Sequence, residues 1–318
     1  MSSPGCVLGI DAGQSGCRFA LSWPDGSRET WTSAGLPSEV PPLAAISGFL
    51  LDAVRNRAEA LGVGRIDSVG AGLTGLHAGV RDLAPLALTT WSERLGTREV
   101  RLADDAVTSF LGALGDRAGV VVAAGTGVTV LACRDGSAPA RVNGWGPTLG
   151  DEGGGYWVGQ QGLRSAYRFV DGRPGSGLLA ELARETFGDL KQLPAALAKS
   201  PRRVADVASF ARQMARAAEG GDPDALRIWR RAAEHLAEAT AAAAHAAGLD
   251  QGPAISYAGA LFGAGSLLLD PLEAALRDLD PQLRLTPPQA DALTGAARLA
   301  SVQDPSKFGI FVDVATTT

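Results

Sequence analysis

Two short β-hairpin patterns, each closed by a glycine-containing turn, constrain the fold of this 318-residue chain most strongly. The first, at residues 7–23, places Asp11 and the turn AGQSG between two apolar runs. The second, at residues 119–133, has Gly-Thr-Gly at 125–127 between apolar runs. Backbone N–H groups in such turns can cradle phosphate oxygens. The first hairpin neither matches GxGxxG nor leads into a helix, so a Rossmann dinucleotide site is excluded.

A third glycine-rich stretch, GWGPTLGDEGGGYW at residues 144–157, comes just before apolar residues at helical spacing. We therefore expect a helix over residues 156–169. Trp145 could cover the apolar side of a sugar ring while Asp151 accepts hydrogen bonds from two adjacent hydroxyls. That pairing suits a polyol better than a dinucleotide. A glycine-rich turn with a buried Trp and an N-capping Asp explains this segment, taken alone, about as well.

The same stretch resembles the GWGxxxGDEGxxYW signature of the N-acetylglucosamine kinase branch of the BadF/BadG/BcrA/BcrD ATPase family, in the actin/Hsp70/sugar-kinase superfamily. The resemblance runs from Leu8 to about Leu299, and the other superfamily motifs come in the expected order. It implies an α/β fold of two RNase H-like domains, residues 1–117 and 118–318, with an interdomain cleft. It also implies that a final helix at about 288–300 packs back on the first domain.

The two hairpins resemble the phosphate loops of that superfamily. On this resemblance Asp11 holds Mg²⁺ through water, and the turns face the phosphates of ATP. Gln14 stands where many relatives have Gly or Thr. A Gly-rich turn after a predicted strand at 253–258 resembles the adenosine motif. The ATP-binding residues implied in this way are Asp11, Gly13, Gln14, Ser15, Gly125, Thr126, Gly127 and Gly259.

The acceptor site is implied by the loops after two further predicted strands, at 66–71 and 98–102. GLTGLH resembles the family's G-L-S/T-G loop, and ADDAVTSFLGAL resembles its N/T-D-A motif. The second motif implies that Asp105 is the base that accepts the proton of the attacking sugar hydroxyl. Acids at a helix N-terminus are otherwise explained as capping and dipole residues. The substrate-binding residues implied are Thr74, Gly75, Asp104, Trp145 and Asp151.

The resemblance thus implies ATP-dependent phosphorylation of an amino sugar, with N-acetylglucosamine at O6 as the leading acceptor and glucosamine as an alternative. The loop at 34–42 lacks the Asn that such kinases offer to the sugar, so the sequence leaves the acceptor open. A non-enzymatic sensor that binds ATP and sugar is the other alternative. The activators of 2-hydroxyacyl-CoA dehydratases in the same family need cysteine ligands for an iron–sulfur cluster, and Cys6, Cys17 and Cys133 form no suitable pair.

Composition limits the partners. The net charge is −5 and the basic residues are scattered, so the sequence predicts no basic patch for binding nucleic acid. We expect a cytoplasmic protein with buried, reduced thiols and no membrane partner, because neither a signal pattern nor an apolar run of membrane length is present. A homodimer is implied by the resemblance alone.

We also expect a helix from Asp222-Pro223 to about residue 247, and a poorly constrained tail after residue 304 despite its apolar stretch at 308–314.

Overall fold

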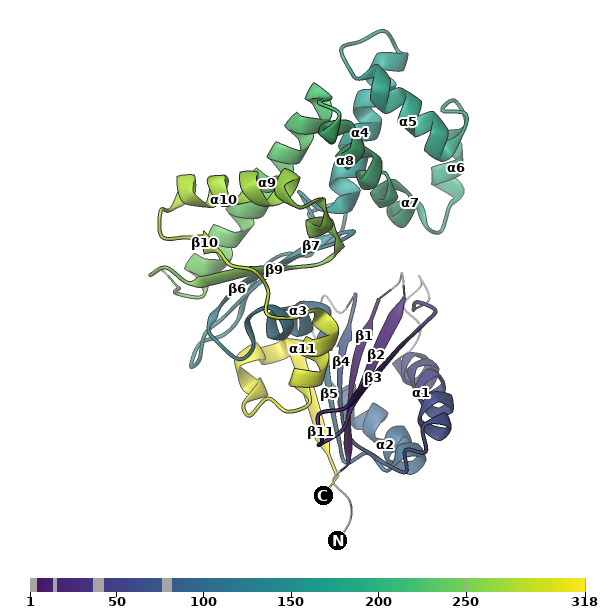
Figure 1. Ribbon diagram of the computed structural model, residues 1–318, viewed down its shortest axis with the longest axis vertical. Coiled ribbons are helices and arrows are strands. Elements are labelled where there is room, and N and C mark those ends of the chain that lie inside the picture. Colours follow the sequence, from purple (N-terminus) through teal and green to yellow (C-terminus); the bar gives the residue numbers. More distant parts are fainter. Residues whose placement is uncertain (1–4, 14–15, 37–42, 76–81, 250, 318) are drawn as a thin grey trace. The chain divides into compact units, whose positions relative to one another are not determined.

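The computed structural model describes residues 5–13, 16–36, 43–75, 82–249 and 251–317 (Figure 1). The chain divides into two compact units. Unit 1 contains residues 1–121, 133–139 and 287–318, and unit 2 contains residues 122–132 and 140–286. The chain therefore leaves unit 1 after residue 121, returns to it briefly at residues 133–139, completes unit 2, and comes back to unit 1 at residue 287.

Unit 1 is built on a mixed sheet with the strand order β11-β5-β4-β1-β2-β3. The strands β1, β4 and β5 are parallel, and the remaining pairs are antiparallel. The predicted hairpin at residues 7–23 is present as β1 and β2, which pair in register from Val7 opposite Ser22 to Ala12 opposite Cys17. The bounds are β1 (Cys6–Ala12), β2 (Cys17–Ser22), β3 (Arg28–Ser33), β4 (Ile66–Leu73), β5 (Glu99–Asp104) and β11 (Val312–Thr316).

Helices cover both faces of this sheet (Figure 1). One face carries α1 (Leu43–Ala60) and α2 (Ala84–Leu95), and the other carries α3 (Asp105–Leu114) and α11 (Ala292–Leu299). Burial from both sides explains why the central parallel strands read as nearly continuous apolar runs. The approach of α11 is especially close. A Cβ atom on Gly70 would overlap the carbonyl oxygen of Ala296, and one on Gly295 would overlap that of Thr108.

The expectation of a poorly constrained tail after residue 304 is wrong. The segment forms η2 (Pro305–Phe311) and then β11, which extends the sheet by antiparallel pairing with β5. Phe308 is fully buried, and the Lys307 Nζ donates to the carbonyl oxygen of Asp116 at 2.9 Å and pairs with its carboxylate. These partners lie far away in the sequence, 191 residues in the case of Asp116, so no local pattern reveals them.

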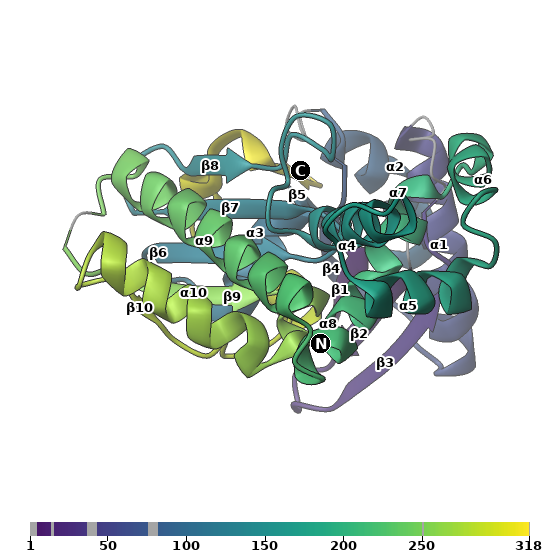
Figure 2. The ribbon, with the colours of Figure 1, turned by 90° about the horizontal axis from the view of Figure 1, so that it is seen from above.

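The second sheet has the strand order β10-β9-β6-β7-β8. Its strands are β6 (Gly119–Ala124), β7 (Val128–Cys133), β8 (Ala140–Asn143), β9 (Ala254–Ala258) and β10 (Arg284–Leu285). The helices α9 (Pro223–Ala246) and α10 (Ser266–Leu279) lie across it (Figure 2). The predicted start of α9 is confirmed, because the Asp222 side chain accepts a hydrogen bond from the Ala225 N–H and Pro223 lies in the first turn.

The rest of unit 2 is helical. The helix predicted at 156–169 is confirmed as α4, which packs against α5, α7, α8 and α9. The remaining bounds are α4 (Gly155–Val170), α5 (Gly177–Phe187), α6 (Leu193–Lys199), α7 (Arg203–Ser209), α8 (Ala211–Glu219) and η1 (Ala260–Ala264).

The three cysteines lie inside the fold. Cys6, Cys17 and Cys133 are buried free thiols, as expected, and burial raises the pKa of Cys133 to about 12. Within the described ranges, no helix combines the length and apolar character needed to cross a bilayer.

We predict that Gly295→Ala destabilises unit 1, because the new methyl group would collide with the backbone of α3. The expected loss is about 1–3 kcal/mol of unfolding free energy, the usual cost of overpacking. Urea unfolding of the purified variant measures this loss. The matched control is Gly48→Ala in α1, where a Cβ atom would meet nothing within 4 Å, so that variant should be as stable as the parent or more so. Equal unfolding free energies for the two variants would refute the packing argument.

Candidate functional site

The carboxyl ends of three neighbouring strands of unit 1 are in register. Ala12 of β1 lies opposite Leu73 of β4, which in turn lies opposite Asp104 of β5. Asp11 and Thr74 therefore occur at the same edge of the sheet, and the Thr74 N–H donates to the carbonyl oxygen of Ala12 at 3.1 Å. Open α/β sheets bind their ligands at this edge. Unit 1 thus brings together the residues predicted from three separate motifs.

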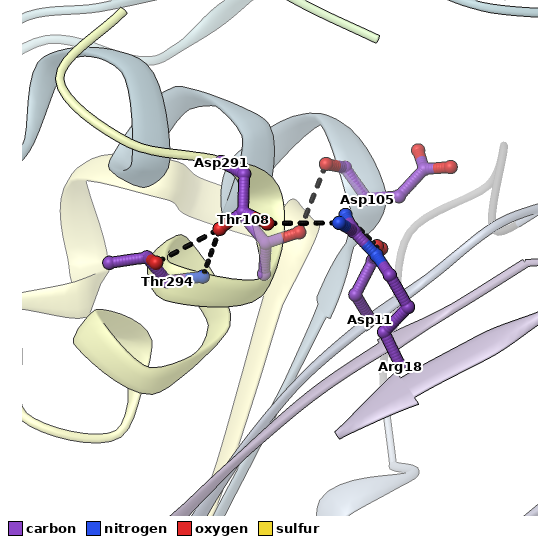
Figure 3. A network of polar contacts seen from close by, with 6 residues as sticks. All are labelled: Asp11, Arg18, Asp105, Thr108, Asp291 and Thr294. Carbon is purple, nitrogen blue, oxygen red and sulfur yellow. Dashed lines mark hydrogen bonds and ion pairs between the residues drawn. The ribbon is translucent and has the colours of Figure 1, made fainter. Parts of the chain in front are cut away.

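The two adjacent acids at the start of α3 have different surroundings. Asp104 is the N-cap, and its buried carboxylate accepts a hydrogen bond from the Ala106 N–H at 3.0 Å. Asp105 is the first helical residue, and its carbonyl oxygen accepts from the Thr108 hydroxyl at 3.1 Å. The carboxylate of Asp105 projects away from the Asp11–Arg18 pair (Figure 3). The capping explanation therefore applies to Asp104, whereas Asp105 presents its carboxylate at the beginning of the helix.

An arginine joins the end of β1 to the start of α11 (Figure 3). Arg18 lies opposite Asp11 in the hairpin, and its Nε and Nη2 donate to the Asp11 Oδ2 at 2.9 and 2.6 Å. Its Nη1 donates to the Asp291 Oδ2 at 2.9 Å. Asp291 is also the N-cap of α11, because its Oδ1 accepts from the N–H and the hydroxyl of Thr294. One guanidinium thus bridges two carboxylates from distant parts of the sequence.

The chemistry of Asp11 fits a Mg²⁺ ion. Magnesium is usually held by one or two carboxylates, with its other ligands from water and substrate phosphates. In the part of the chain that the structure describes, no group of three or more His, Cys, Asp or Glu side chains is arranged to hold a metal. Arg18 occupies only the Oδ2 of Asp11, and Oδ1 makes no hydrogen bond to a described residue. A single carboxylate of this kind suits an ion whose remaining ligands come from phosphates and water.

The first turn is described in part. The Gly13 N–H donates to the carbonyl oxygen of Gly16 at 3.1 Å, and the Gly13 carbonyl accepts from the Leu36 N–H at 2.9 Å. Gly75 follows Thr74 with a φ of +86°, in the left-handed region that glycine adopts at little cost. The predicted phosphate-facing residues Gln14 and Ser15, and residues 37–42 of the loop that lacks the Asn, lie outside the described residues.

The second turn is held by the start of α4. The Gly125 N–H donates to the carbonyl oxygen of Gly127 at 2.9 Å, which closes the turn between β6 and β7. The first two amides of α4 reach back to it, since Gly155 N–H donates to the Gly125 carbonyl at 2.8 Å and Tyr156 N–H donates to the Thr126 carbonyl at 2.9 Å. The shape of this loop is therefore fixed by the helix that the GDEG segment introduces.

Asp151 lies against the same turn. A Cβ atom on Gly127 would overlap the Asp151 carboxylate, so glycine is required for that approach. Asp151 has a φ of +59°, and its N–H donates to the Asn143 side-chain oxygen at 2.6 Å. Its side chain is buried, with 8% of the residue exposed. Left-handed backbone at a residue other than glycine is uncommon and concentrates at functional sites.

Two further predicted residues belong to unit 2. Trp145 is 69% exposed, which contradicts the explanation of residues 144–157 as a turn with a buried Trp. Gly259 has a φ of +104°, and a Cβ atom there would overlap the carbonyl oxygen of Ala124 at the end of β6. The start of the predicted adenosine motif therefore lies beside the turn at 125–127. Unit 2 thus gathers this turn, Asp151 and Gly259.

Comparison with known proteins decides the family. The model of the BadF/BadG/BcrA/BcrD ATPase family matches residues 8–300. The chain belongs to this family. One curated relative, the N-acetylmuramic acid/N-acetylglucosamine kinase of Clostridium acetobutylicum, is 32% identical over 75 residues. That match covers 24% of this chain and 24% of the relative, about a quarter of each.

Solved structures share the fold of this family member. A putative N-acetylglucosamine kinase from Chromobacterium violaceum has a TM-score of 0.72 and 25% identity, with 94% of this chain and 100% of that chain covered. A ROK family glucokinase from Streptomyces griseus, solved with glucose and AMPPNP, has a TM-score of 0.61 and 18% identity, with 93% and 98% covered. The predicted α/β fold of the actin-like and sugar-kinase group is thereby confirmed.

Three residues of this BadF/BadG/BcrA/BcrD family member were not predicted as parts of the site. Arg18 contacts Asp11 directly across the hairpin, and the opposite charges would have indicated the pair once the register was known. Asn143 orients the backbone of Asp151, and Asp291 is 273 residues away from Arg18. Neither contact leaves a signal in the local sequence.

We predict that the unfolding free energy of Asp291→Asn falls less at acid pH than that of the parent. Burial raises the pKa of Asp291, but the hydrogen bonds from Thr294 and the charge of Arg18 outweigh it and hold the pKa below its usual value. A carboxylate of this kind contributes stability above its unfolded pKa of about 3.9, and this stability is lost as the pH falls through the lower folded value. Asn retains the cap but does not titrate.

Urea unfolding at pH 6 and pH 3 measures this effect. The parent should lose more unfolding free energy between the two pH values than Asp291→Asn does. Asp278→Asn, at an exposed position on α10, is the matched control and should behave as the parent does. Parallel losses in the parent and in Asp291→Asn would contradict the prediction.

Proposed function

We propose that this protein phosphorylates an amino sugar with ATP, and that N-acetylglucosamine at its O6 hydroxyl is the acceptor. The observation that carries the proposal is the register of β1, β4 and β5, because it lines up Asp11, Thr74 and Asp105 at the ligand-binding edge of a sheet. Membership of the family supports ATP use. The likeness to structures described as putative N-acetylglucosamine kinases supports the choice of acceptor.

In the proposed reaction Asp105 acts as the general base. Its carboxylate takes the proton of the sugar hydroxyl while the oxygen forms a bond to the γ-phosphorus of ATP, and the bond from that phosphorus to the bridging oxygen breaks to release ADP. Phosphoryl transfer of this kind needs positioning and charge stabilisation more than covalent help from the protein. Asp105 is the first residue of α3, and its carboxylate projects away from the Arg18 guanidinium (Figure 3). This direction suits the proposed role, because Arg18 pairs with Asp11 instead.

The acceptor would be held by groups around the GDEG segment and the loop after β4. The exposed ring of Trp145 would offer a flat apolar face to the sugar. The carboxylate of Asp151 would accept hydrogen bonds from the sugar hydroxyls. Thr74 and Gly75 would contact the sugar from the loop after β4, next to the capping acid Asp104.

ATP would be held by the two hairpin turns and the segment at Gly259. The turn at 125–127 is already fixed by α4, so its backbone requires little ordering when a phosphate binds. The first turn would contribute Gly13, Gln14 and Ser15 to the terminal phosphates. Asp11 would hold Mg²⁺, which when bound neutralises phosphate charge.

The central prediction is sugar-dependent release of ADP. With MgATP, the parent should release ADP most rapidly with N-acetylglucosamine in a panel that also contains glucosamine, N-acetylmuramic acid and glucose. Asp105→Asn should lower kcat by roughly 10²–10⁴, the usual contribution of a positioned base. Asp278→Asn, at an exposed position on α10 outside the proposed site, is the control and should turn over as the parent does.

Three outcomes would change the proposal. Near-normal turnover by folded Asp105→Asn would remove Asp105 from the role of base. A preference for glucosamine would move the acceptor to the free amino sugar. Saturable ATP and sugar binding without ADP release would indicate the sensor alternative instead of an enzyme.

We predict a different kinetic effect for Trp145→Ala. The ring is largely exposed, so its removal should leave the thermal unfolding midpoint unchanged. The loss of one aromatic face should raise the KM for the sugar roughly three- to tenfold with little change in kcat. Leu279→Ala, which removes an exposed apolar side chain at the end of α10, should alter neither constant. An unchanged KM in Trp145→Ala would exclude stacking of the sugar on this ring.

A further inference from the structure

A second concave site lies within unit 2, between α4 on one side and α6 and α7 on the other. The cavity has a volume of about 530 Å³, which falls within the range of small-molecule sites. The backbones of α4 and α7 approach closely beside the cavity, because a Cβ atom on Gly159 would overlap the carbonyl oxygen of Val207, a lining residue. Two walls are therefore fixed before any ligand arrives.

The two sides of this cavity differ in chemistry. Along α4, Tyr156, Gln160, Arg164 and Arg168 recur every four residues and form one polar stripe facing the cavity. The opposite wall is apolar and comes from α6, with Leu193, Pro194 and Leu197. A ligand that fits must therefore combine polar groups along one edge with an apolar face along the other.

The polar side is basic. None of the described residues that line the cavity is acidic, and Arg164 makes no hydrogen bond or ion pair to any described residue. Arg168 donates its Nε to the carbonyl oxygen of Pro174 at 2.8 Å, which leaves both of its terminal nitrogens for other partners. Two like charges four residues apart on a helix repel each other. The nearby carboxylate of Asp224 is already engaged by Ser165 and Arg227.

The aromatic side chains of the cavity are held in place. The Tyr167 hydroxyl donates to the carbonyl oxygen of Leu190 at 2.6 Å, and the Tyr156 hydroxyl accepts from the Gln160 amide at 3.2 Å. Each ring therefore presents a fixed surface, and the Tyr156 hydroxyl keeps its own proton for donation. Fixed aromatic rings beside guanidinium groups suit a ring-shaped ligand that carries an anionic group.

We propose that this cavity is a second ligand site, which binds a small organic anion consisting of a sugar-sized ring with a phosphate or carboxylate group. Arg164 and Arg168 bind the anionic group, and the tyrosine rings and the apolar wall of α6 contact the ring. None of the side chains assigned above to phosphoryl transfer takes part. The site therefore stands whether or not the proposed kinase activity is correct.

Isothermal titration calorimetry of the full chain tests this site with three probes: glucose 6-phosphate, glucuronate and inorganic phosphate. Glucose 6-phosphate and glucuronate distinguish a phosphate from a carboxylate, and inorganic phosphate measures the anion without a ring. We expect saturable binding of at least one of the two sugar acids, more tightly than inorganic phosphate. Arg164→Ala combined with Arg168→Ala should weaken that binding by about tenfold or more, because two charge-assisted contacts are lost.

The matched control is Arg230→Ala on α9, an exposed arginine outside the cavity that makes no hydrogen bond or ion pair to a described residue. It should bind the probe as the parent does. If thermal unfolding shows that the double variant is not folded, the single variant Arg164→Gln replaces it. Failure of the parent to bind either sugar acid would overturn the proposal. Equal affinities in the parent and the arginine variant would also overturn it, because the anion would then be bound elsewhere.

Discussion

The close approach of α11 to the sheet and to α3 is the constraint on which unit 1 depends. Backbone meets backbone there, and a side chain at any of four positions would overlap the opposing main chain: Gly9, Gly70, Gly112 and Gly295. Such contacts leave α11 little freedom to shift, because close-packed protein interiors have low compressibility. The N-cap of α11, Asp291, is held in place as a result, and the position of Arg18 follows from it.

The Asp11–Arg18–Asp291 network connects this packing to the candidate site. Arg18 is anchored at one end by a carboxylate that caps a tightly packed helix, and at the other end it holds one oxygen of Asp11. The orientation of the proposed magnesium-binding carboxylate is thus determined by a segment from the far end of the sequence. In unit 2 the same kind of support comes from α4, whose first amides hold the turn at 125–127. A helix that contributes no side chain to the proposed chemistry therefore supports Asp11 in unit 1 and the turn at 125–127 in unit 2.

Local sequence patterns predicted the elements whose causes are local. The hairpin at 7–23, the start of α4 after its glycines and the Asp222 cap of α9 depend on neighbouring residues, and the structure has all three. The tail after residue 304 was misjudged because its order comes from pairing with β5 and from the burial of Phe308. The residue types of the site could be predicted because they sit in motifs, but the contacts of Arg18 depend on strand register and on a helix 273 residues away. The roles of the site residues stay predictions.

The discontinuity of unit 1 has a consequence for biosynthesis. About 165 residues separate residue 121 from residue 287, and almost all of them belong to unit 2. At typical translation rates of about 5–20 residues per second, the roughly 208 residues from Asp104 at the end of β5 to Val312 at the start of β11 take about 10–42 s to synthesise. During that interval the edge of β5 has no β11 to pair with, and exposed strand edges invite aggregation. Unit 2, in contrast, is complete when residue 286 emerges, so it can finish folding before unit 1, which contains the first residues of the chain.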